Sequence, residues 1–280
     1  MLRKLFYIVH FAFAVSSCDS ISQPGETDTN HPVVEVDDEN VDEEDEIEGP
    51  LICEVKADSI IEPDSLAALY LFDGDYLDYS GNCRHAESGG SPDFVEGLAG
   101  QALRFDGLRD FVRIPAELSA LPASSYTVTM LMKLLHERWD PEVVASWTGA
   151  CLWYKGWNSS AGRFQGFSFC DEGGGSGFRP ASGTWVMIVV RSEALVLDHK
   201  SFRIRKIGDE NINWISRWDA SAGEITGGRE ILLGTRETSS LENGDRFQGV
   251  IDEVRVYNRT LTVEEEKRIF DYYSQFIGQD

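Results

Sequence analysis

The chain has 280 residues, enough for one large domain or two small ones. It carries 48 acidic against 25 basic side chains, a formal net charge of −23. This charge argues against a nucleic-acid partner, because phosphate binding needs a basic surface.

The N-terminal stretch has the pattern of an export signal. Arg3 and Lys4 precede an apolar run over residues 5–15, which is shorter than the about 20 residues that span a bilayer and suits a signal peptide. The stretch ends in Ser-Ser-Cys, which resembles the lipobox of bacterial lipoproteins. We predict a lipoprotein signal over residues 1–18, with a lipidated Cys18 anchoring the protein to a membrane of the bacterial cell envelope, periplasmic or surface-exposed. An ordinary secretory signal is the alternative.

The next segment, residues 19–50, is strongly acidic. It contains thirteen Asp and Glu residues and no Lys or Arg, so it holds more than half of the net charge. Like charges repel and there is little to bury, so we predict a disordered, extended tether.

From residue 51 onward, short apolar or alternating runs are separated by Gly, Asp, Asn and Ser. At least ten of these runs read as strands, among them LAALYLF, YTVTMLMKL, TWVMIVVR and GVIDEVRVY. No helical pattern alternates with them, which disfavours a parallel sheet. We therefore predict one all-β domain over residues 51–280, a sandwich or jelly roll. The stretch RTLTVEEEKRIFDYYSQF predicts a C-terminal helix, with Thr262 and Glu265 forming a capping box.

Four cysteines follow Cys18, an even number that favours two disulfides in an exported chain. Three connectivities are possible. Cys151 and Cys170 lie in consecutive predicted strands and could face each other, which leaves Cys53 with Cys83. Four free thiols are the alternative.

The stretch YLFDGDYLDYSGN, residues 70–82, is a candidate cation site. Asp73, Asp75, Asp78 and Asn82 follow an apolar run, and their side-chain oxygens are the ligands that calcium prefers. Nothing beyond proximity supports Asp75. Asp-Gly and Ser-Gly-Asn are also common turn sequences, so a polar turn remains the alternative.

The last predicted strand, GVIDEVRVY, contains a second candidate ligand. The period of two places Asp252 on one face with Val250, Val254 and Val256, the face expected to meet the core. A buried carboxylate is costly unless it is paired. Asp252 therefore needs an arginine, backbone N–H groups, or a cation shared with another acidic loop.

Three blocks of the sequence resemble a known family. These are LAALYLFDGDYLDYSGNCRHA, GLAGQALRFDGLRDFVRIP and FQGVIDEVRVYNRTLTVEEEKRIF. In order and spacing they are similar to the laminin-G-like (concanavalin A-like lectin/glucanase) jelly-roll domains of bacterial surface proteins. The resemblance covers roughly residues 65–275 and is weak over 130–235.

The resemblance implies a two-sheet antiparallel jelly roll with a short C-terminal helix. It also implies one structural Ca²⁺ where the first loop meets the last strand. Its side-chain ligands would be Asp73 and Asp252, with further oxygens from the loop at Asp78 to Asn82.

An aromatic segment, CLWYKGWNSSAGRF, is the candidate ligand-binding surface. Trp and Tyr can stack on sugar rings or anchor a protein partner, so Trp153, Tyr154 and Trp157 are the candidate contacts. Strand alternation places Trp153 and Tyr154 on opposite faces, so we expect one of them in the core.

The predicted function is a non-enzymatic, lipid-anchored binding protein. It would present a calcium-stabilised laminin-G-like domain to a glycan or a protein. A structural or assembly protein of the envelope, without a small-molecule ligand, is the alternative. A glycoside-active enzyme is less favoured, because retaining glycosidases of this superfamily carry Glu-x-Asp-x-Glu on one strand, and the nearest match, at residues 44–48, lies in the tether.

Overall fold

The computed structural model divides the chain into two units, Met1–Ile47 and Glu48–Asp280. All described residues lie in the second unit. They are residues 53, 55, 60–61, 63–115, 125–136, 142–147, 150–158, 163–169, 176–193, 199–209, 215–219, 230–236 and 246–278. The predicted signal, Cys18 and the predicted tether therefore lie outside the described residues.

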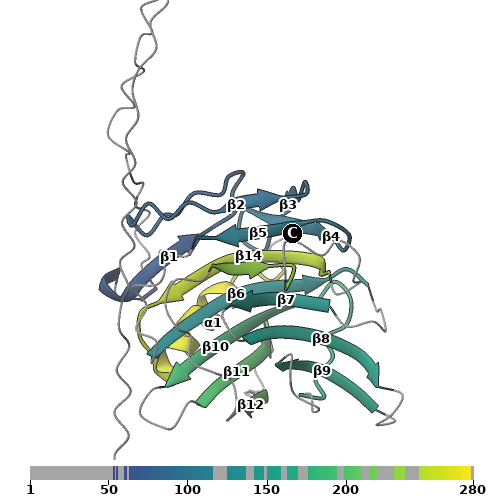
Figure 1. The fold of residues 1–280 in the computed structure, drawn as a ribbon. Helices are drawn as coiled ribbons and strands as arrows, with labels where there is room; N and C mark the ends of the chain where they lie inside the picture. The colour runs from purple at the N-terminus through teal and green to yellow at the C-terminus, as the bar shows by residue number, and fades with distance from the viewer. Residues whose placement is uncertain are drawn as a thin grey trace, which may run out of the picture. The chain divides into compact units, whose positions relative to one another are not determined.

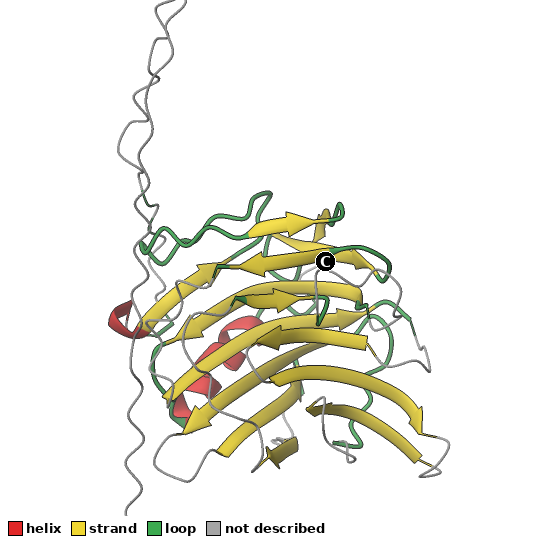
Figure 2. Cartoon of the chain, viewed as in Figure 1, coloured by secondary structure: helices red, strands yellow, loops and turns green. Residues whose placement is uncertain are grey.

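Two antiparallel sheets form the described domain (Figures 1 and 2). The larger has the order β12-β11-β10-β6-β14-β4-β3, with β1 also paired to β14, and the smaller has the order β2-β5-β13-β7-β8-β9. The strands of the larger sheet are β1 Leu66–Tyr70, β3 Asp93–Glu96, β4 Gln101–Asp106, β6 Ser125–Leu134, β10 Trp185–Glu193, β11 His199–Lys206, β12 Ile215–Asp219 and β14 Gln248–Tyr257. Those of the smaller sheet are β2 Glu87–Gly89, β5 Phe111–Ile114, β7 Glu142–Trp147, β8 Ala150–Asn158, β9 Arg163–Phe169 and β13 Ile231–Leu233.

A short 3-10 helix, η1 (Pro63–Ser65), precedes β1, and α1 (Val263–Ser274) follows β14. The predicted two-sheet antiparallel sandwich with a short C-terminal helix is confirmed.

The core lies between the two sheets. Val128, Met130 and Met132 of β6 alternate along the strand and share one buried cluster with Val112 and Val144 of the smaller sheet. Burial of this apolar surface is the main stabilising contribution to the fold.

Strand β10 is buried on both faces. Val186 and Ile188 join the core between the sheets, whereas Met187 and Val189 join a second cluster with Ile269 of α1. Double burial explains why WVMIVV is a continuous apolar run rather than an alternating one. The second cluster lies on the outer face of the larger sheet, which α1 covers (Figure 2).

The capping box begins α1 as predicted. The Thr262 hydroxyl accepts the Glu265 N–H at 3.2 Å, and the Glu265 carboxylate accepts the Thr262 N–H at 2.8 Å. Arg259 donates two hydrogen bonds to the same carboxylate, at 2.8 and 2.6 Å. These contacts, led by Arg259, lower the pKa of Glu265 from its ordinary 4.5 to about 2.

This capping carboxylate predicts a pH dependence of stability. Because its pKa is lower in the folded state, the stabilisation is complete above pH 4.5 and is lost as pH falls toward 2. We expect Glu265→Gln to lower the free energy of unfolding by about 1 kcal/mol at pH 7. Between pH 4.5 and 2 the variant should lose less of that free energy than the wild type, as measured by urea unfolding. Glu264→Gln, one residue earlier and exposed, is the control. If Glu265→Gln loses as much unfolding free energy as the wild type when pH falls from 4.5 to 2, Glu265 is not the group responsible.

A buried ion cluster fixes α1 to the sheet. Glu266 is 0% exposed and accepts hydrogen bonds from Arg191 at 3.3 Å and from Arg203 at 2.6 Å. The Arg205 guanidinium lies 3.5 Å from the centre of the Phe270 ring, a cation–π contact. The helix is thus held by charge as well as by its apolar stripe.

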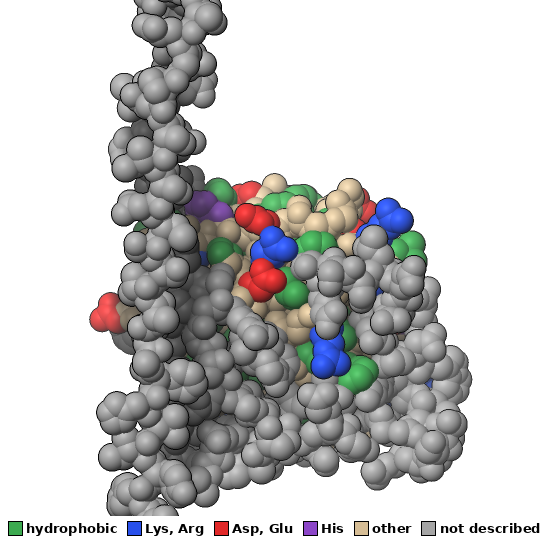
Figure 3. Space-filling model, viewed as in Figure 1, with side chains coloured by type: hydrophobic (Ala, Val, Ile, Leu, Met, Phe, Trp, Pro, Cys, Tyr) green, Lys and Arg blue, Asp and Glu red, His purple; other side chains and the backbone are tan. Residues whose placement is uncertain are grey.

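No helix within the described residues combines the length and the hydropathy needed to cross a bilayer. On the face drawn in Figure 3, acidic, basic and hydrophobic side chains are interspersed over the described part.

Candidate functional site

A β-bulge places Asp252 differently from the sequence prediction. The pairing of β14 with β6 shifts register between Asp252 and Arg255, and Glu253 has a φ of 53°, in the left-handed region. As a result Val250 lies in the outer cluster, whereas Val254 belongs to the core between the sheets. The prediction of one continuous valine face is therefore wrong, because the bulge reverses the alternation.

Asp252 is nevertheless buried, at 0% exposure. Its Oδ2 accepts the Leu98 N–H at 3.3 Å, whereas its Oδ1, equally buried, makes no hydrogen bond to any described residue. Burial raises the pKa of Asp252 well above its ordinary value, and the neighbouring Glu253 raises it further. An orphaned, desolvated carboxylate oxygen is a costly feature unless another group neutralises it.

Asp73, which follows β1, contacts the same turn as Asp252, residues 97–101 between β3 and β4. Its Oδ1 accepts the Gln101 N–H at 2.8 Å, and its charge contributes to the raised pKa of Asp252. A Cβ on Gly97 would lie 2.7 Å from Asp252 Oδ2, and one on Gly100 would lie 2.1 Å from Asp73 Oδ1. The two glycines therefore let both carboxylates approach one turn closely.

The glycine requirement can be tested directly. Gly100 (φ 74°) and Gly177 (φ 71°) share the left-handed backbone, but in the described structure a Cβ on Gly177 would meet nothing within 4 Å. We expect Gly100→Ala to lose about 1 kcal/mol more stability in urea unfolding than Gly177→Ala, because it displaces Asp73 from Gln101. Equal losses in the two variants would show that contact with Asp73 is unimportant.

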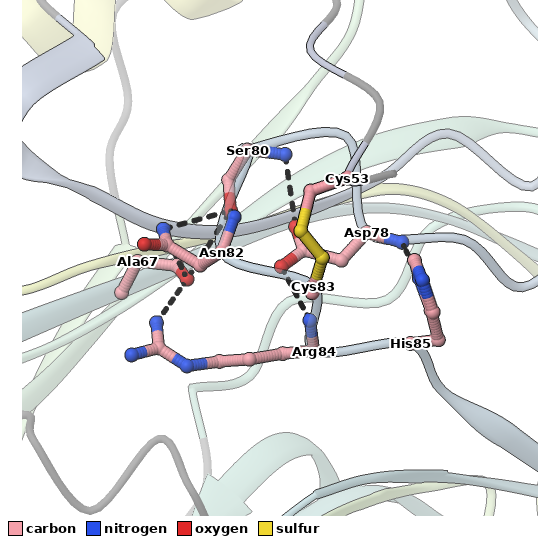
Figure 4. The surroundings of a disulfide bond; sticks show 8 residues. All are labelled: Cys53, Ala67, Asp78, Ser80, Asn82, Cys83, Arg84 and His85. Carbon is pink, nitrogen blue, oxygen red and sulfur yellow. Dashed lines mark hydrogen bonds between the residues drawn. A yellow bond between two sulfur atoms is a disulfide. The ribbon is translucent and has the colours of Figure 1, made fainter. Parts of the chain in front are cut away.

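Asp78, the third predicted ligand, lies in a different cluster (Figure 4). It is 0% exposed, and its carboxylate accepts the backbone N–H groups of Ser80 at 2.9 Å and Arg84 at 3.0 Å. It also accepts the Leu69 N–H at 3.0 Å. His85 Nδ1 accepts the Asp78 N–H at 3.0 Å. The sequence signal, a carboxylate before Ser-Gly-Asn, is here explained by turn chemistry.

Asn82, the fourth predicted ligand, also bonds to the backbone. Its side-chain amide donates to the Ala67 carbonyl at 3.2 Å (Figure 4). The same amide donates to the Leu66 carbonyl at 3.2 Å. Leu66 begins β1, and Asp73 follows the other end of that strand. The structure therefore brings together Asp73 and Asp252 and does not bring Asn82 to them.

A disulfide joins Cys53 and Cys83, with Cα atoms 5.0 Å apart (Figure 4). This is the pairing expected from the sequence, and it joins Cys53 to the loop that Asp78 organises. For the second predicted disulfide, the register of β8 against β9 pairs Leu152 with Phe169, the residues next in sequence to Cys151 and Cys170. Cys170 lies outside the described residues, so the predicted pairing of Cys151 with Cys170 stays a prediction.

The site fits calcium in part. Calcium takes six to eight oxygen ligands, and carboxylates can be combined with backbone carbonyls and waters. Asp73 and Asp252 offer carboxylate oxygens at one turn, and the orphaned Oδ1 of Asp252 is what a cation would satisfy. No three His, Cys, Asp or Glu side chains of the described residues form a group that could hold a metal. Backbone carbonyls and waters would have to supply the remaining ligands.

Comparison with known proteins gives the fold. No protein-family model and no curated protein matches the chain. Domain 4 of AbnA, an extracellular GH43 arabinanase of Geobacillus stearothermophilus solved with arabinotriose, matches with a TM-score of 0.51 and 17% identity, over 76% of this chain and 98% of that one. The shared fold is a two-sheet antiparallel β-sandwich.

Two toxin domains share this sandwich. The binding domain of Paraclostridial Mosquitocidal Protein 1 gives a TM-score of 0.52 at 15% identity, covering 75% of this chain and 53% of that one. The receptor-binding domain of a botulinum neurotoxin C/D mosaic gives 0.50 at 12% identity, covering 75% and 52%. The chain thus spans about half the length of these toxin domains, and at such identities only the fold is shared.

The three aromatic residues predicted to contact a ligand do not form one surface. Tyr154 is 1% exposed and packs in the core with its ring 5.2 Å from that of Phe167, so it is not a ligand contact. Trp153 is half-buried on the outer face of the smaller sheet, against Val143. The side chain of Trp157 lies outside the described ones. The sequence did not predict which ring enters the core, because alternation along a strand shows that neighbours lie on opposite faces but not which face is buried.

Sequence reasoning missed the role of the turn at residues 97–101. Its signal was present, since GLAGQ holds two glycines between two strands, a pattern that marks close backbone approach. The bulge at Glu253 had no comparable signal, because a non-glycine residue with positive φ is rare.

Proposed function

We propose that this protein is a non-catalytic, glycan-binding module of the bacterial cell envelope, stabilised by one calcium ion and anchored by lipid on Cys18. The acidic segment at residues 19–50 would hold the domain away from the membrane as an extended tether. Asp73 and Asp252 would hold the ion and clasp the turn at residues 97–101 to the last strand.

The observation that carries the glycan proposal is the match to domain 4 of AbnA. The match covers 98% of that domain, which was solved in complex with arabinotriose, so the likeness extends over the whole of a domain with a bound sugar and supports a glycan ligand here. The predicted export signal and the predicted tether support a place in the cell envelope. The nearest match to Glu-x-Asp-x-Glu lies at residues 44–48, in the predicted tether, which favours binding without hydrolysis.

A glycan array tests the proposal. The chain from residue 19, with the tether intact, is applied in calcium buffer to an array of plant, bacterial and host glycans, arabinotriose included. Reproducible binding to a defined glycan class supports the function. Retention on no glycan would overturn it, and release of reducing sugar from a bound glycan would show an enzyme instead.

A further inference from the structure

A cavity of about 290 Å³ opens beside the turn that Asp252 holds. One wall is the end of β3 and the start of the turn, Glu96, Gly97 and Leu98; another is the segment after α1, residues 276–278. The floor is the outer face of the larger sheet, where Lys133 of β6 pairs with Trp185 of β10. Segments distant in sequence thus converge on one space, whose strands are labelled in Figure 1.

The chemistry of the lining is mixed and balanced in charge. Glu96 supplies a carboxylate that accepts hydrogen bonds, and Lys133 supplies an ammonium that donates them. The Lys133 Nζ lies 4.5 Å from the centre of the Trp185 ring, which places the cation over the indole. Trp185 is 8% exposed, so the ring is a floor rather than a broad stacking platform. Phe276 adds a second aromatic ring.

We propose that this cavity binds a neutral sugar residue, which rests on the glycan-binding function proposed above. A neutral sugar has hydroxyls that donate to a carboxylate and accept from an ammonium, and apolar C–H groups that meet aromatic rings. The volume of about 290 Å³ lies just below the range for ligand sites, about 300–1,000 Å³, and therefore suits a small ligand such as one sugar ring. A charged sugar would be attracted by one of the two side chains, Glu96 or Lys133, and repelled by the other.

The cavity shares its wall with the carboxylate pair. Leu98 lines the cavity and donates its N–H to Asp252. Gly97 also lines the cavity, and a Cβ on it would lie 2.7 Å from Asp252 Oδ2. Whatever fixes Asp252 therefore also fixes one wall of the sugar site. We expect sugar affinity to fall when the turn is released.

The test compares variants of the cavity with matched variants elsewhere. Glu96→Gln and Lys133→Met change the polar groups and keep the length of each side chain. Glu87→Gln on β2 and Lys206→Met on β11 are exposed controls. Binding of the best array glycan is measured by titration calorimetry. Saturation-transfer NMR with galactose, glucose and arabinose is compared with glucuronic acid and glucosamine. A melting temperature for each variant checks folding.

We expect both cavity variants to lose about tenfold or more in affinity, the loss of one charge-assisted hydrogen bond, while both controls keep wild-type affinity. Neutral sugars should give stronger transfer than the charged ones. A glycan that binds all variants equally would overturn the cavity assignment and leave the glycan-binding function standing. Preference for a charged sugar would also overturn it. Failure of every glycan to bind the wild type would overturn both proposals.

Discussion

Saturating calcium is expected to raise the melting temperature of the metal-free protein by about 5–10 °C. A ligand present at 100 times its dissociation constant stabilises the folded state by about 2.7 kcal/mol, and each kcal/mol shifts the melting temperature of a domain this size by about 2–4 °C. The physical reason is the buried Asp252, whose Oδ1 has no hydrogen-bond partner among the described residues. A cation would neutralise this carboxylate together with Asp73.

The variant Asp252→Asn tests whether a rise in melting temperature in calcium comes from binding at this site. In chelator we expect this variant to melt no lower than the wild type, because the substitution removes a buried charge beside Glu253. In calcium it should melt lower than the wild type, because it no longer gains the ion. Asp93→Asn, an exposed carboxylate on β3, should respond to calcium as the wild type does. Identical wild-type melting curves in calcium and in chelator would disprove the site.

Glu266→Ala is expected to destabilise the protein by about 3–5 kcal/mol, measured by urea unfolding. The substitution removes the carboxylate that Arg191 and Arg203 share beneath α1. Desolvated charges that lose their partner cost far more than the surface pairs of the same helix. Glu264→Ala, two residues earlier and exposed, should cost less than about 1 kcal/mol.

A triple variant distinguishes lost charge pairing from lost volume. Arg191→Met, Arg203→Met and Glu266→Met together replace the cluster with apolar side chains of similar length. Such replacements are often neutral or stabilising, so we expect the triple variant to be more stable than Glu266→Ala. If it is no more stable, the cluster is not a charge-pairing device. A loss below about 1 kcal/mol in Glu266→Ala would equally contradict the argument.

The sandwich was predictable because its signals are local and repeated. Short apolar runs with turn residues between them identify strands, and the Thr262–Glu265 spacing identifies the start of α1. Even the doubly buried β10 is visible as an unbroken apolar run. What these patterns do not encode is which sheet each strand joins, since pairing depends on contacts far apart in the chain.

The candidate site was predictable in part. Asp73 and Asp252 were paired by resemblance and lie at one turn. The route to Asp252 by strand alternation failed, because the bulge at Glu253 interrupts the period of two. Asp78 and Asn82 look like ligands in the sequence because turn-forming and metal-binding side chains are the same residue types. Only the backbone hydrogen bonds that they make distinguish the two roles.

The disulfide between Cys53 and Cys83 has a mechanical consequence for a protein held by its N-terminal end. If the chain is anchored as proposed, a pull on its N-terminal end would reach the described domain at Cys53. From there a covalent bond passes the load to Cys83, in the loop that Asp78 secures through three backbone amides. Under the anchoring proposed above, β1 would therefore not be the first element to be peeled from β14, because a covalent bond would carry part of the load to Cys83.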